Sequence, residues 1–161
     1  MRAVVCTTFD GIDALSCVDD APEPPMTNGA VRLKVHAAGI NFADTLMCKG
    51  QYQVKPPFPF SPGLEVAGEV LEVAPGVTRV KPGDRVMATV HYGGYASEAV
   101  TDASTVYAIP DNLDFISAAA FPIVYGTSHV GLRDKLKLQA GETLLVHGAA
   151  GGVGLTAVEI A

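Results

Sequence analysis

The feature that most constrains the fold is a glycine-dense turn near the end of the chain, at residues 148–154. A short apolar run with β-branched residues, 143–147, comes before the turn, and apolar residues at helical spacing follow it to residue 161. This order predicts a strand, a tight turn and a helix. A helix that begins directly after such a turn offers free backbone N–H groups and the positive end of its dipole, which suits a phosphate group.

The turn has the spacing of a dinucleotide-binding fingerprint, with one departure. Ala149, Gly151 and Gly154 read A-x-G-x-x-G, so alanine replaces the first of the three usual glycines. We expect Gly151 to allow close approach of a pyrophosphate and Gly154 to allow close packing of the helix. The alternative is a glycine-rich turn that binds nothing, but the flanking strand and helix favour the phosphate interpretation. The residue that selects NAD or NADP is expected about 20 residues further on, after the last residue of this sequence.

The composition predicts a folded chain with an apolar core. Hydrophobic residues make up 48% and charged residues 17%, which argues against disorder. The net charge of −6 weighs against a nucleic-acid or anionic-membrane surface, and no run approaches the ~20 apolar residues of a membrane helix. Cys6, Cys17 and Cys48 are odd in number and widely spaced, which is typical of reduced thiols, so we expect a cytoplasmic protein.

Residues 1–115 show the pattern of a small β-barrel, because short runs of β character alternate with glycine and proline turns. We predict strands at 2–6, 15–18, 31–35, 66–73, 85–90, 96–100 and 106–109. A hairpin turn is expected at 92–95, and a stiff surface loop through the prolines of residues 56–62. Asn41 is the expected N-cap of a short helix at 42–49.

The pattern changes to helices near residue 115. Apolar residues recur at helical spacing from residue 114, Pro122 interrupts this helix, and a second helix is expected at 124–136. Together with the final strand, turn and helix, residues 116–161 predict the start of an α/β domain. That domain is incomplete, since a βαβ unit needs about 30 residues or more and only one strand and part of a helix are present.

Four sequence blocks occur in a characteristic order: AGINFAD at 38–44, PGLEVAG at 62–68, KPGDRV at 81–86 and AAGGVG at 149–154. Together they resemble the medium-chain dehydrogenase/reductase superfamily, and more closely its zinc-free NADPH:quinone oxidoreductase branch. The resemblance implies a GroES-like catalytic and substrate domain at 1–115, followed by the beginning of a Rossmann dinucleotide-binding domain at 116–161. It also implies that the chain is the N-terminal half of a longer enzyme, which we expect to be a homodimer.

Two positions distinguish this chain from the zinc alcohol dehydrogenases. The resemblance places Asn41 and Leu64 where those enzymes carry a cysteine and a histidine that bind catalytic zinc. An amide and a leucine cannot replace a thiolate and an imidazole as zinc ligands, so we expect no metal site. Zinc would act as a Lewis acid on a carbonyl oxygen. Without it, the favoured acceptor is one that delocalises its own charge, namely a quinone or an α,β-unsaturated carbonyl.

The reductant implied by the resemblance is NADPH, and NADH is not excluded. The candidate catalytic residues are Asn41 and Tyr52, which flank the position that zinc occupies in the zinc enzymes. Asn41 also belongs to the predicted cofactor-binding set, whose other members are Thr127, Ala150, Gly151, Gly152, Val153 and Gly154.

Each of the three polar candidates also has a structural interpretation. Asn41 serves equally as a helix cap, Tyr52 as a loop anchor, and Thr127 as a helix hydroxyl bonded back to its own backbone. Asp44 is expected to be a first-turn carboxylate and Glu65 a brace for its loop.

Three functional hypotheses follow. The first is an NAD(P)H-dependent enzyme that reduces a small quinone or enone, without a nucleic-acid or membrane partner. The second is a nucleotide-binding relative without catalysis. The third is an inactive fragment, and on this hypothesis we expect the 161-residue chain alone to bind a dinucleotide weakly.

Overall fold

The structure is a computed structural model that describes all 161 residues. Its internal contacts divide the chain into two units, Met1–Ala120 and Phe121–Ala161. The first unit contains all of the β-strands, and the second is helical. None of the helices combines the length and the apolar character that crossing a bilayer requires.

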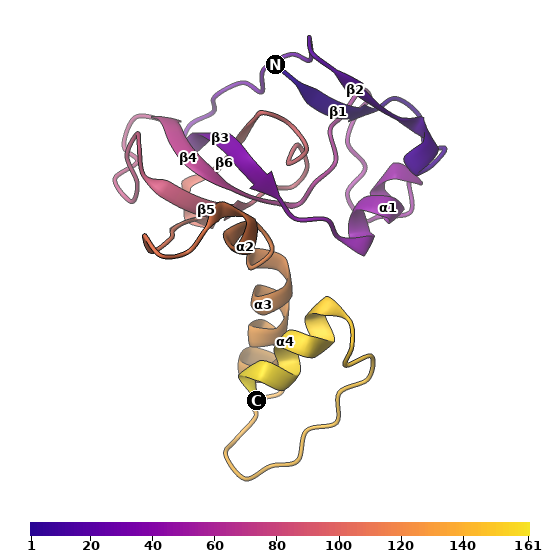
Figure 1. Cartoon of the computed structure of the whole chain (residues 1–161), viewed down its shortest axis with the longest axis vertical. Helices are drawn as coiled ribbons and strands as arrows, with labels where there is room; N and C mark the ends of the chain where they lie inside the picture. Colours follow the sequence, from indigo (N-terminus) through magenta and orange to yellow (C-terminus); the bar gives the residue numbers. More distant parts are fainter. The chain divides into compact units, whose positions relative to one another are not determined.

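Antiparallel strands form the framework of the first unit (Figure 1). Two strands make a separate ribbon, β1 (Ala3–Cys6) and β2 (Leu15–Val18). Five others form one sheet in the order β6-β3-β4-β5-β7. Their bounds are β3 (Ala30–Ala38), β4 (Glu65–Val73), β5 (Arg85–Thr89), β6 (Glu98–Asp102) and β7 (Val106–Ala108). The predicted mostly β fold of this part of the chain is confirmed.

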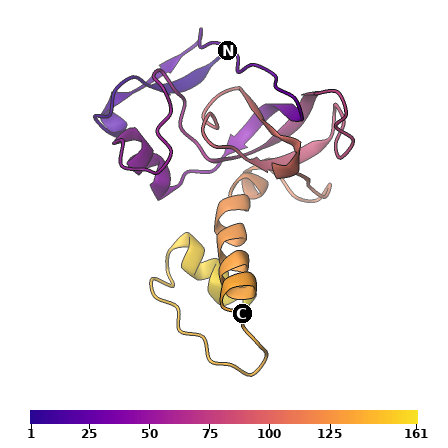
Figure 2. The same cartoon turned by 180° about the vertical axis from the view of Figure 1, so that it is seen from behind.

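Alternation along β3 sets the core face of the sheet. Val31 and Leu33 are fully buried, whereas Lys34 is exposed. The view from behind shows how the strands and loops of this unit curve (Figure 2). Val31 and Leu33 belong to the hydrophobic core of the unit, whose other buried members are Val66, Val70, Val80, Val86, Ala88, Val90, Ala99 and Val106.

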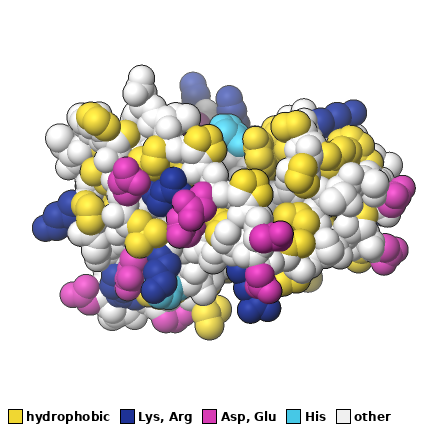
Figure 3. Space-filling view, turned by 90° about the horizontal axis from the view of Figure 1, so that it is seen from above, with side chains coloured by type: hydrophobic (Ala, Val, Ile, Leu, Met, Phe, Trp, Pro, Cys, Tyr) yellow, Lys and Arg dark blue, Asp and Glu magenta, His cyan; other side chains and the backbone are white.

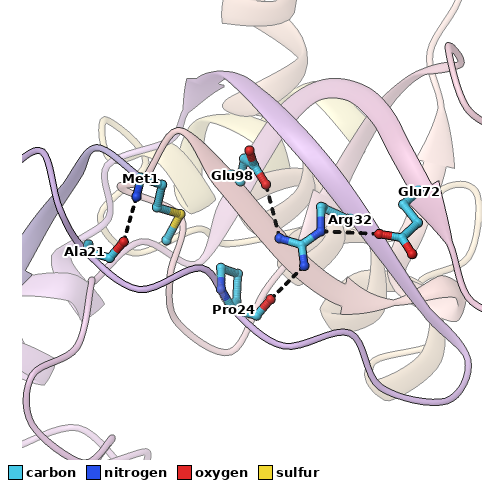
Figure 4. A network of polar contacts seen from close by, with 6 residues as sticks. All are labelled: Met1, Ala21, Pro24, Arg32, Glu72 and Glu98. Carbon is cyan, nitrogen blue, oxygen red and sulfur yellow. Dashed lines mark hydrogen bonds and ion pairs between the residues drawn. The ribbon is translucent and has the colours of Figure 1, made fainter.

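Arg32, on the other face of β3, ties the N-terminal loop to the sheet (Figure 4). Its guanidinium donates to Glu98 Oε2 at 3.1 Å and to the Pro24 carbonyl at 3.0 Å, and it lies 3.7 Å from Glu72 Oε2. The side chain is only 14% exposed. The amino group of Met1 anchors the same loop through a 2.6 Å bond to the carbonyl of Ala21.

Short helices connect the strands of the first unit. As predicted, α1 (Phe42–Cys48) begins after the N-cap Asn41. Two 3₁₀ turns, Ile12–Ala14 and Ala103–Thr105, precede β2 and β7, and α2 (Phe115–Ala119) follows β7.

The predicted hairpin at residues 92–95 is wrong. β5 pairs with β4 and β7, whereas β6 pairs with β3, so the chain crosses the unit between β5 and β6. We call residues 92–97 the crossing segment. Backbone N–H groups of residues 93–95 donate bonds of 2.7–3.2 Å to carbonyls of residues 61–63. These bonds satisfy the backbone of the crossing segment, which a hairpin would have paired with β5.

The proline-rich loop at 56–62 lies only partly on the surface, which corrects the prediction of a surface loop. Phe60 and Pro62 are buried, and the backbone of Phe60 exchanges bonds of 2.7 and 3.1 Å with Cys6 of β1. A loop with few free N–H groups of its own can be buried where neighbouring strands satisfy those that remain.

α2 packs on the sheet of the first unit. Ala118 and Ala119 are buried against Ala67 and Ile109. Phe115 lies between two side chains of the sheet: the His36 ring stacks on it at 4.5 Å, and the Arg85 guanidinium lies 4.7 Å from its centroid. The contacts of residues 116–120, which the sequence pattern assigned to the second domain, are therefore with the first unit.

The second unit contains α3 (Pro122–His129), a π-helical turn at Val130–Lys135, and α4 (Gly152–Ile160). Pro122 occupies the first turn of α3, so it separates α2 from α3 as predicted. α3 and α4 lie side by side in both views (Figures 1 and 2). Ser128 Oγ donates to the Val153 carbonyl at 2.7 Å and lies 2.8 Å from Thr156 Oγ1, which joins the two helices through buried hydroxyls.

The strand predicted at residues 143–147 is absent, because residues 142–146 carry no regular secondary structure and pair with no strand. A strand forms only where a neighbour accepts its ladder of hydrogen bonds. The chain offers no second strand in this unit. Leu145 consequently remains 77% exposed.

Candidate functional site

Asp44 is the centre of a buried polar cluster in the first unit. It lies in the first turn of α1 and is 4% exposed. Asp44 Oδ2 accepts hydrogen bonds of 2.7 Å from the Asn41 backbone N–H and from the Tyr95 hydroxyl, and Oδ1 accepts one of 3.2 Å from the Gly63 N–H. The carboxylate therefore joins α1, the loop before β4 and the crossing segment. Burial of a carboxylate is tolerated because several donors compensate its lost hydration.

Glu65, the first residue of β4, approaches Asn41 from another direction. It is 2% exposed, and its Oε1 accepts a 2.8 Å bond from Asn41 Nδ2. The close packing depends on Gly39, since a Cβ there would lie 2.2 Å from Glu65 Oε1. The expected role of Glu65 as a brace fits this contact. The structure also confirms that Asn41 caps α1, where it forms a capping box with Asp44.

Tyr95 is the member of the cluster that sequence reasoning missed. Burial, and then its hydrogen bond to Asp44, raise the pKa of its hydroxyl above the ordinary value of 10.0, so the hydroxyl remains a donor at neutral pH. The sequence gives little sign of this role, because Tyr95 follows two glycines that are typical of a hairpin. Its partner lies 51 residues away in the sequence.

Two glycines let the crossing segment reach the cluster. Gly63 has a positive φ of 95°, and a Cβ there would lie 2.7 Å from the Tyr95 ring and 2.8 Å from the Gly94 Cα. At Gly94 a Cβ would lie 3.0 Å from the Gly63 carbonyl carbon. The two backbones therefore pack at a separation that side chains would prevent.

Tyr52 lies outside this hydrogen-bonded cluster. It follows α1 in an irregular loop, it is half-buried, and its hydroxyl has no protein hydrogen-bond partner. The structure therefore brings Asn41 together with Asp44, Glu65 and Tyr95, and leaves the Tyr52 hydroxyl available. A shallow pocket of about 500 Å³ borders the cluster through Tyr95 and Ile40, and most of its lining is apolar.

The residues of the first unit do not form a metal-binding set. No three His, Cys, Asp or Glu side chains converge as candidate ligands. Leu64 is buried and apolar, and the amide of Asn41 is bonded to Glu65.

Figure 3 shows acidic and basic side chains next to one another on the face in view, so no patch of a single charge covers that face.

The glycine turn of the second unit leads directly into α4. Gly148 has a positive φ of 67°, and Gly151 is the N-cap of the helix, with no side chain that caps it. Gly154 permits a tight turn, because a Cβ there would lie 2.3 Å from the Gly148 carbonyl oxygen. In contrast, a Cβ at Gly151 would meet only that oxygen, at 3.5 Å. Gly151, Gly152 and Val153 are exposed, so the first N–H groups of α4 lie at an open surface.

Ala150 and Thr127 complete the predicted cofactor set in this unit, and both are exposed. Thr127 lies on α3, and its hydroxyl makes no bond to the protein. The alternative of a hydroxyl bonded back to its own helix fits Thr156 instead, whose Oγ1 has the Gly152 and Val153 carbonyls as alternative acceptors at 3.1 and 3.0 Å.

Comparison with known proteins identifies relatives of the chain. Residues 27–111 match the alcohol dehydrogenase GroES-like domain family. Quinone oxidoreductase-like protein 2 of Rattus norvegicus is 43% identical over 160 residues, which are 99% of this chain and 45% of that protein.

Solved structures show the same relationship. The human synaptic vesicle membrane protein VAT-1 homolog-like protein is 38% identical with a TM-score of 0.92, over 99% of this chain and 52% of the other. The quinone oxidoreductase of Thermus thermophilus, which was also solved with NADPH, is 36% identical with a TM-score of 0.83, over 99% and 49%. The chain thus spans about half the length of its relatives. With its GroES-like domain, it belongs to the medium-chain dehydrogenase/reductase superfamily, and the relatives that it matches include quinone oxidoreductases.

Proposed function

We propose that the protein that contains this chain is an NAD(P)H-dependent oxidoreductase, which transfers hydride to a quinone or an α,β-unsaturated carbonyl without zinc. One observation carries the proposal: α4 begins at an exposed glycine turn, and no side chain caps its first N–H groups. These groups fit a pyrophosphate, because they are free donors at the positive end of a helix dipole. The relative from Thermus thermophilus that was solved with NADPH supports this choice of cofactor.

In the second unit, the proposed cofactor residues have different roles. The exposed N–H groups of Gly152 and Val153 would hold the phosphates, Gly151 and Ala150 would keep the approach free of bulk, and Gly154 would allow the close packing of the turn. The exposed Thr127 hydroxyl is available to a polar group of the cofactor. NADPH supplies the hydride when bound, and the residues of the chain bind and orient it.

Residue types in the first unit support a reaction without a metal. Asn41 and Leu64 offer zinc neither a thiolate nor an imidazole. The acceptor must therefore carry its own developing charge with help from hydrogen bonds alone. Conjugated acceptors meet this requirement, since they delocalise the charge over several atoms.

Two side chains are proposed to contact the acceptor. Tyr52 has a hydroxyl with no protein partner, which can donate to a carbonyl oxygen. Asn41 has an amide that Glu65 holds at one N–H, and it keeps further hydrogen-bonding capacity.

The test is to measure NADPH oxidation by the protein, expressed with any sequence that adjoins these residues in its gene. Quinones and enones should be reduced, and simple ketones should not. Reduction of simple ketones at a similar rate would contradict the conjugated-acceptor proposal. Cofactor binding without turnover over a broad acceptor panel would instead select a non-catalytic nucleotide-binding relative.

A further inference from the structure

Two buried carboxylates hold the candidate catalytic residue Asn41, one at its backbone and the other at its side chain. Asp44 accepts from its backbone N–H at 2.7 Å, and Glu65 accepts from its side-chain Nδ2 at 2.8 Å. The two carboxylates are 4% and 2% exposed. A hydrogen bond to a buried charged group is stronger and better defined in geometry than one at an exposed site.

Glu65 and the capping box favour the same orientation of the Asn41 amide, with its oxygen toward the Asp44 backbone and its nitrogen toward Glu65. A carboxylate only accepts hydrogen bonds, so the nitrogen of the amide must point toward it. Glu65 itself has little freedom to move, because its side chain fills the space above Gly39 so closely that a Cβ there would overlap it. The orientation of the Asn41 amide is therefore fixed by packing as well as by charge.

Asp44 is in turn held by groups outside α1. The Tyr95 hydroxyl donates to the same Oδ2 that binds Asn41, and the Gly63 N–H donates to Oδ1. Both donors belong to the paired backbones of the crossing segment and residues 61–63. The start of α1, and with it Asn41, is thus fixed to the crossing segment by a contact distant in sequence.

From this geometry we infer that Glu65, and Tyr95 through Asp44, are positioning residues that hold the Asn41 amide in one orientation for its ligand. The inference rests on the proposed function, because it requires that Asn41 contact the substrate or the cofactor. An aligned hydrogen-bonding group contributes to the rate only if it is held in place before the reaction, and a displacement of about 1 Å can reduce the rate roughly 100-fold.

A kinetic double-mutant cycle on the complete protein tests this inference, with a quinone acceptor and NADPH. Glu65→Gln keeps the shape of the side chain but removes the carboxylate that requires a nitrogen of the Asn41 amide to face it, and Tyr95→Phe removes one donor to Asp44. Each is expected to lower kcat by about 10-fold. In an Asn41→Ala background, neither should lower kcat further, because the residue through which they act is gone.

Several controls separate positioning from general stability. Tyr92→Phe, in the same crossing segment but outside the cluster, should leave kcat unchanged, and thermal unfolding of each variant reports on folding. If Glu65→Gln fails to fold, the cycle with Tyr95→Phe carries the same test. If Glu65→Gln or Tyr95→Phe lowers kcat by the same factor in the Asn41→Ala background as in the wild type, the inference is overturned. The proposed function would still stand in that case, provided that the wild type turns over. An unchanged kcat in Asn41→Ala would also overturn it. No wild-type turnover with any conjugated acceptor would reject the proposed function, and the inference with it.

Discussion

The Tyr95 hydroxyl donates a 2.7 Å hydrogen bond to Asp44 Oδ2, across 51 residues of sequence. This bond fixes the start of α1 to the crossing segment. Because Asp44 also accepts from the Asn41 backbone, the position of the candidate catalytic residue depends on how closely the crossing segment approaches residues 61–63.

Gly63 should tolerate a side chain much less well than a glycine of similar backbone conformation. In Gly63→Ala, the new methyl group meets the Tyr95 ring at 2.7 Å, in addition to the strain of a positive φ of 95°. Gly76→Ala is the matched control, since its φ is 84° and nothing lies within 4 Å. We expect a loss of roughly 1–2 kcal/mol for Gly76→Ala and at least about 1 kcal/mol more for Gly63→Ala. Urea unfolding of the two variants measures the difference, and equal losses would contradict the packing argument.

Arg32→Met should destabilise the first unit through its bonds to Glu98 and Pro24. Methionine keeps an apolar stem but removes the guanidinium, so the expected loss in unfolding free energy is roughly 1.5–3 kcal/mol. Arg2→Met is the control, because Arg2 is 74% exposed and lies 3.5 Å from Asp19. Exposed pairs of this kind contribute little, because water and salt screen the two charges. Similar losses for the two variants would show that the buried contacts of Arg32 contribute no more to the unfolding free energy than the exposed pair of Arg2.

Alkaline pH should destabilise the first unit through Cys48. Burial, and then the neighbouring Cys6, raise the pKa of the Cys48 thiol from 9.0 to about 11 in the folded protein. Between these two values the unfolded chain binds fewer protons than the folded one, so stability falls as pH rises through that window. The contribution is fully present below pH 9.0.

The urea midpoint of the wild type should therefore fall between pH 9 and pH 11. Cys48→Ala removes the titrating thiol and should show a smaller fall over the same range. The raised pKa of Tyr95 adds to the loss at the upper end, and this contribution is present in both proteins. Parallel pH profiles would show that Cys48 does not cause the effect.

In the second unit, Thr156→Val should loosen the contact between α3 and α4. Valine keeps the branched shape but removes the hydroxyl, which contacts Ser128 Oγ at 2.8 Å and lies 3.1 Å from the Val124 carbonyl. A buried hydrogen bond of this kind contributes about 1 kcal/mol, or about a fivefold change in an equilibrium constant. Amide hydrogen exchange in α4 should accelerate by a similar factor. The exposed Thr143, replaced in the same way, should leave it unchanged.

Patterns local in sequence predicted much of the fold. The period-two alternation in β3 and the cap at Asn41 need only neighbouring residues, and both are found in the structure. The failures concern long-range pairing. The sequence at Tyr92–Tyr95 predicts a hairpin because glycines are common in turns, but in the structure Gly94 packs closely against Gly63 instead. Residues 143–147 have the composition of a strand, yet they lack a neighbour to pair with.

The candidate site shows the same difference between local patterns, which could be predicted, and long-range contacts, which could not. The glycine turn and the helix after it follow from spacing alone, and so does the presence of Asn41 at the start of α1. That Asp44 and Glu65 converge on Asn41 depends on the register of β4 and on the path of the crossing segment. Carboxylates within otherwise apolar blocks were the available signal for their burial.

NADPH affinity of Gly151→Val, compared with the wild type, tests the central claim most directly. Gly151 has an ordinary φ of −82°, and a Cβ there would make only an ordinary 3.5 Å contact with the Gly148 carbonyl oxygen, so a side chain should leave the fold intact. It should nevertheless block a phosphate from the first N–H groups of α4. Calorimetry on the complete protein should give binding at least about 10-fold weaker, the loss of roughly one good charge-assisted hydrogen bond. Gly131→Ala, on the π-helical turn, should bind as the wild type does. Unchanged affinity in a folded Gly151→Val protein would contradict a dinucleotide at this turn.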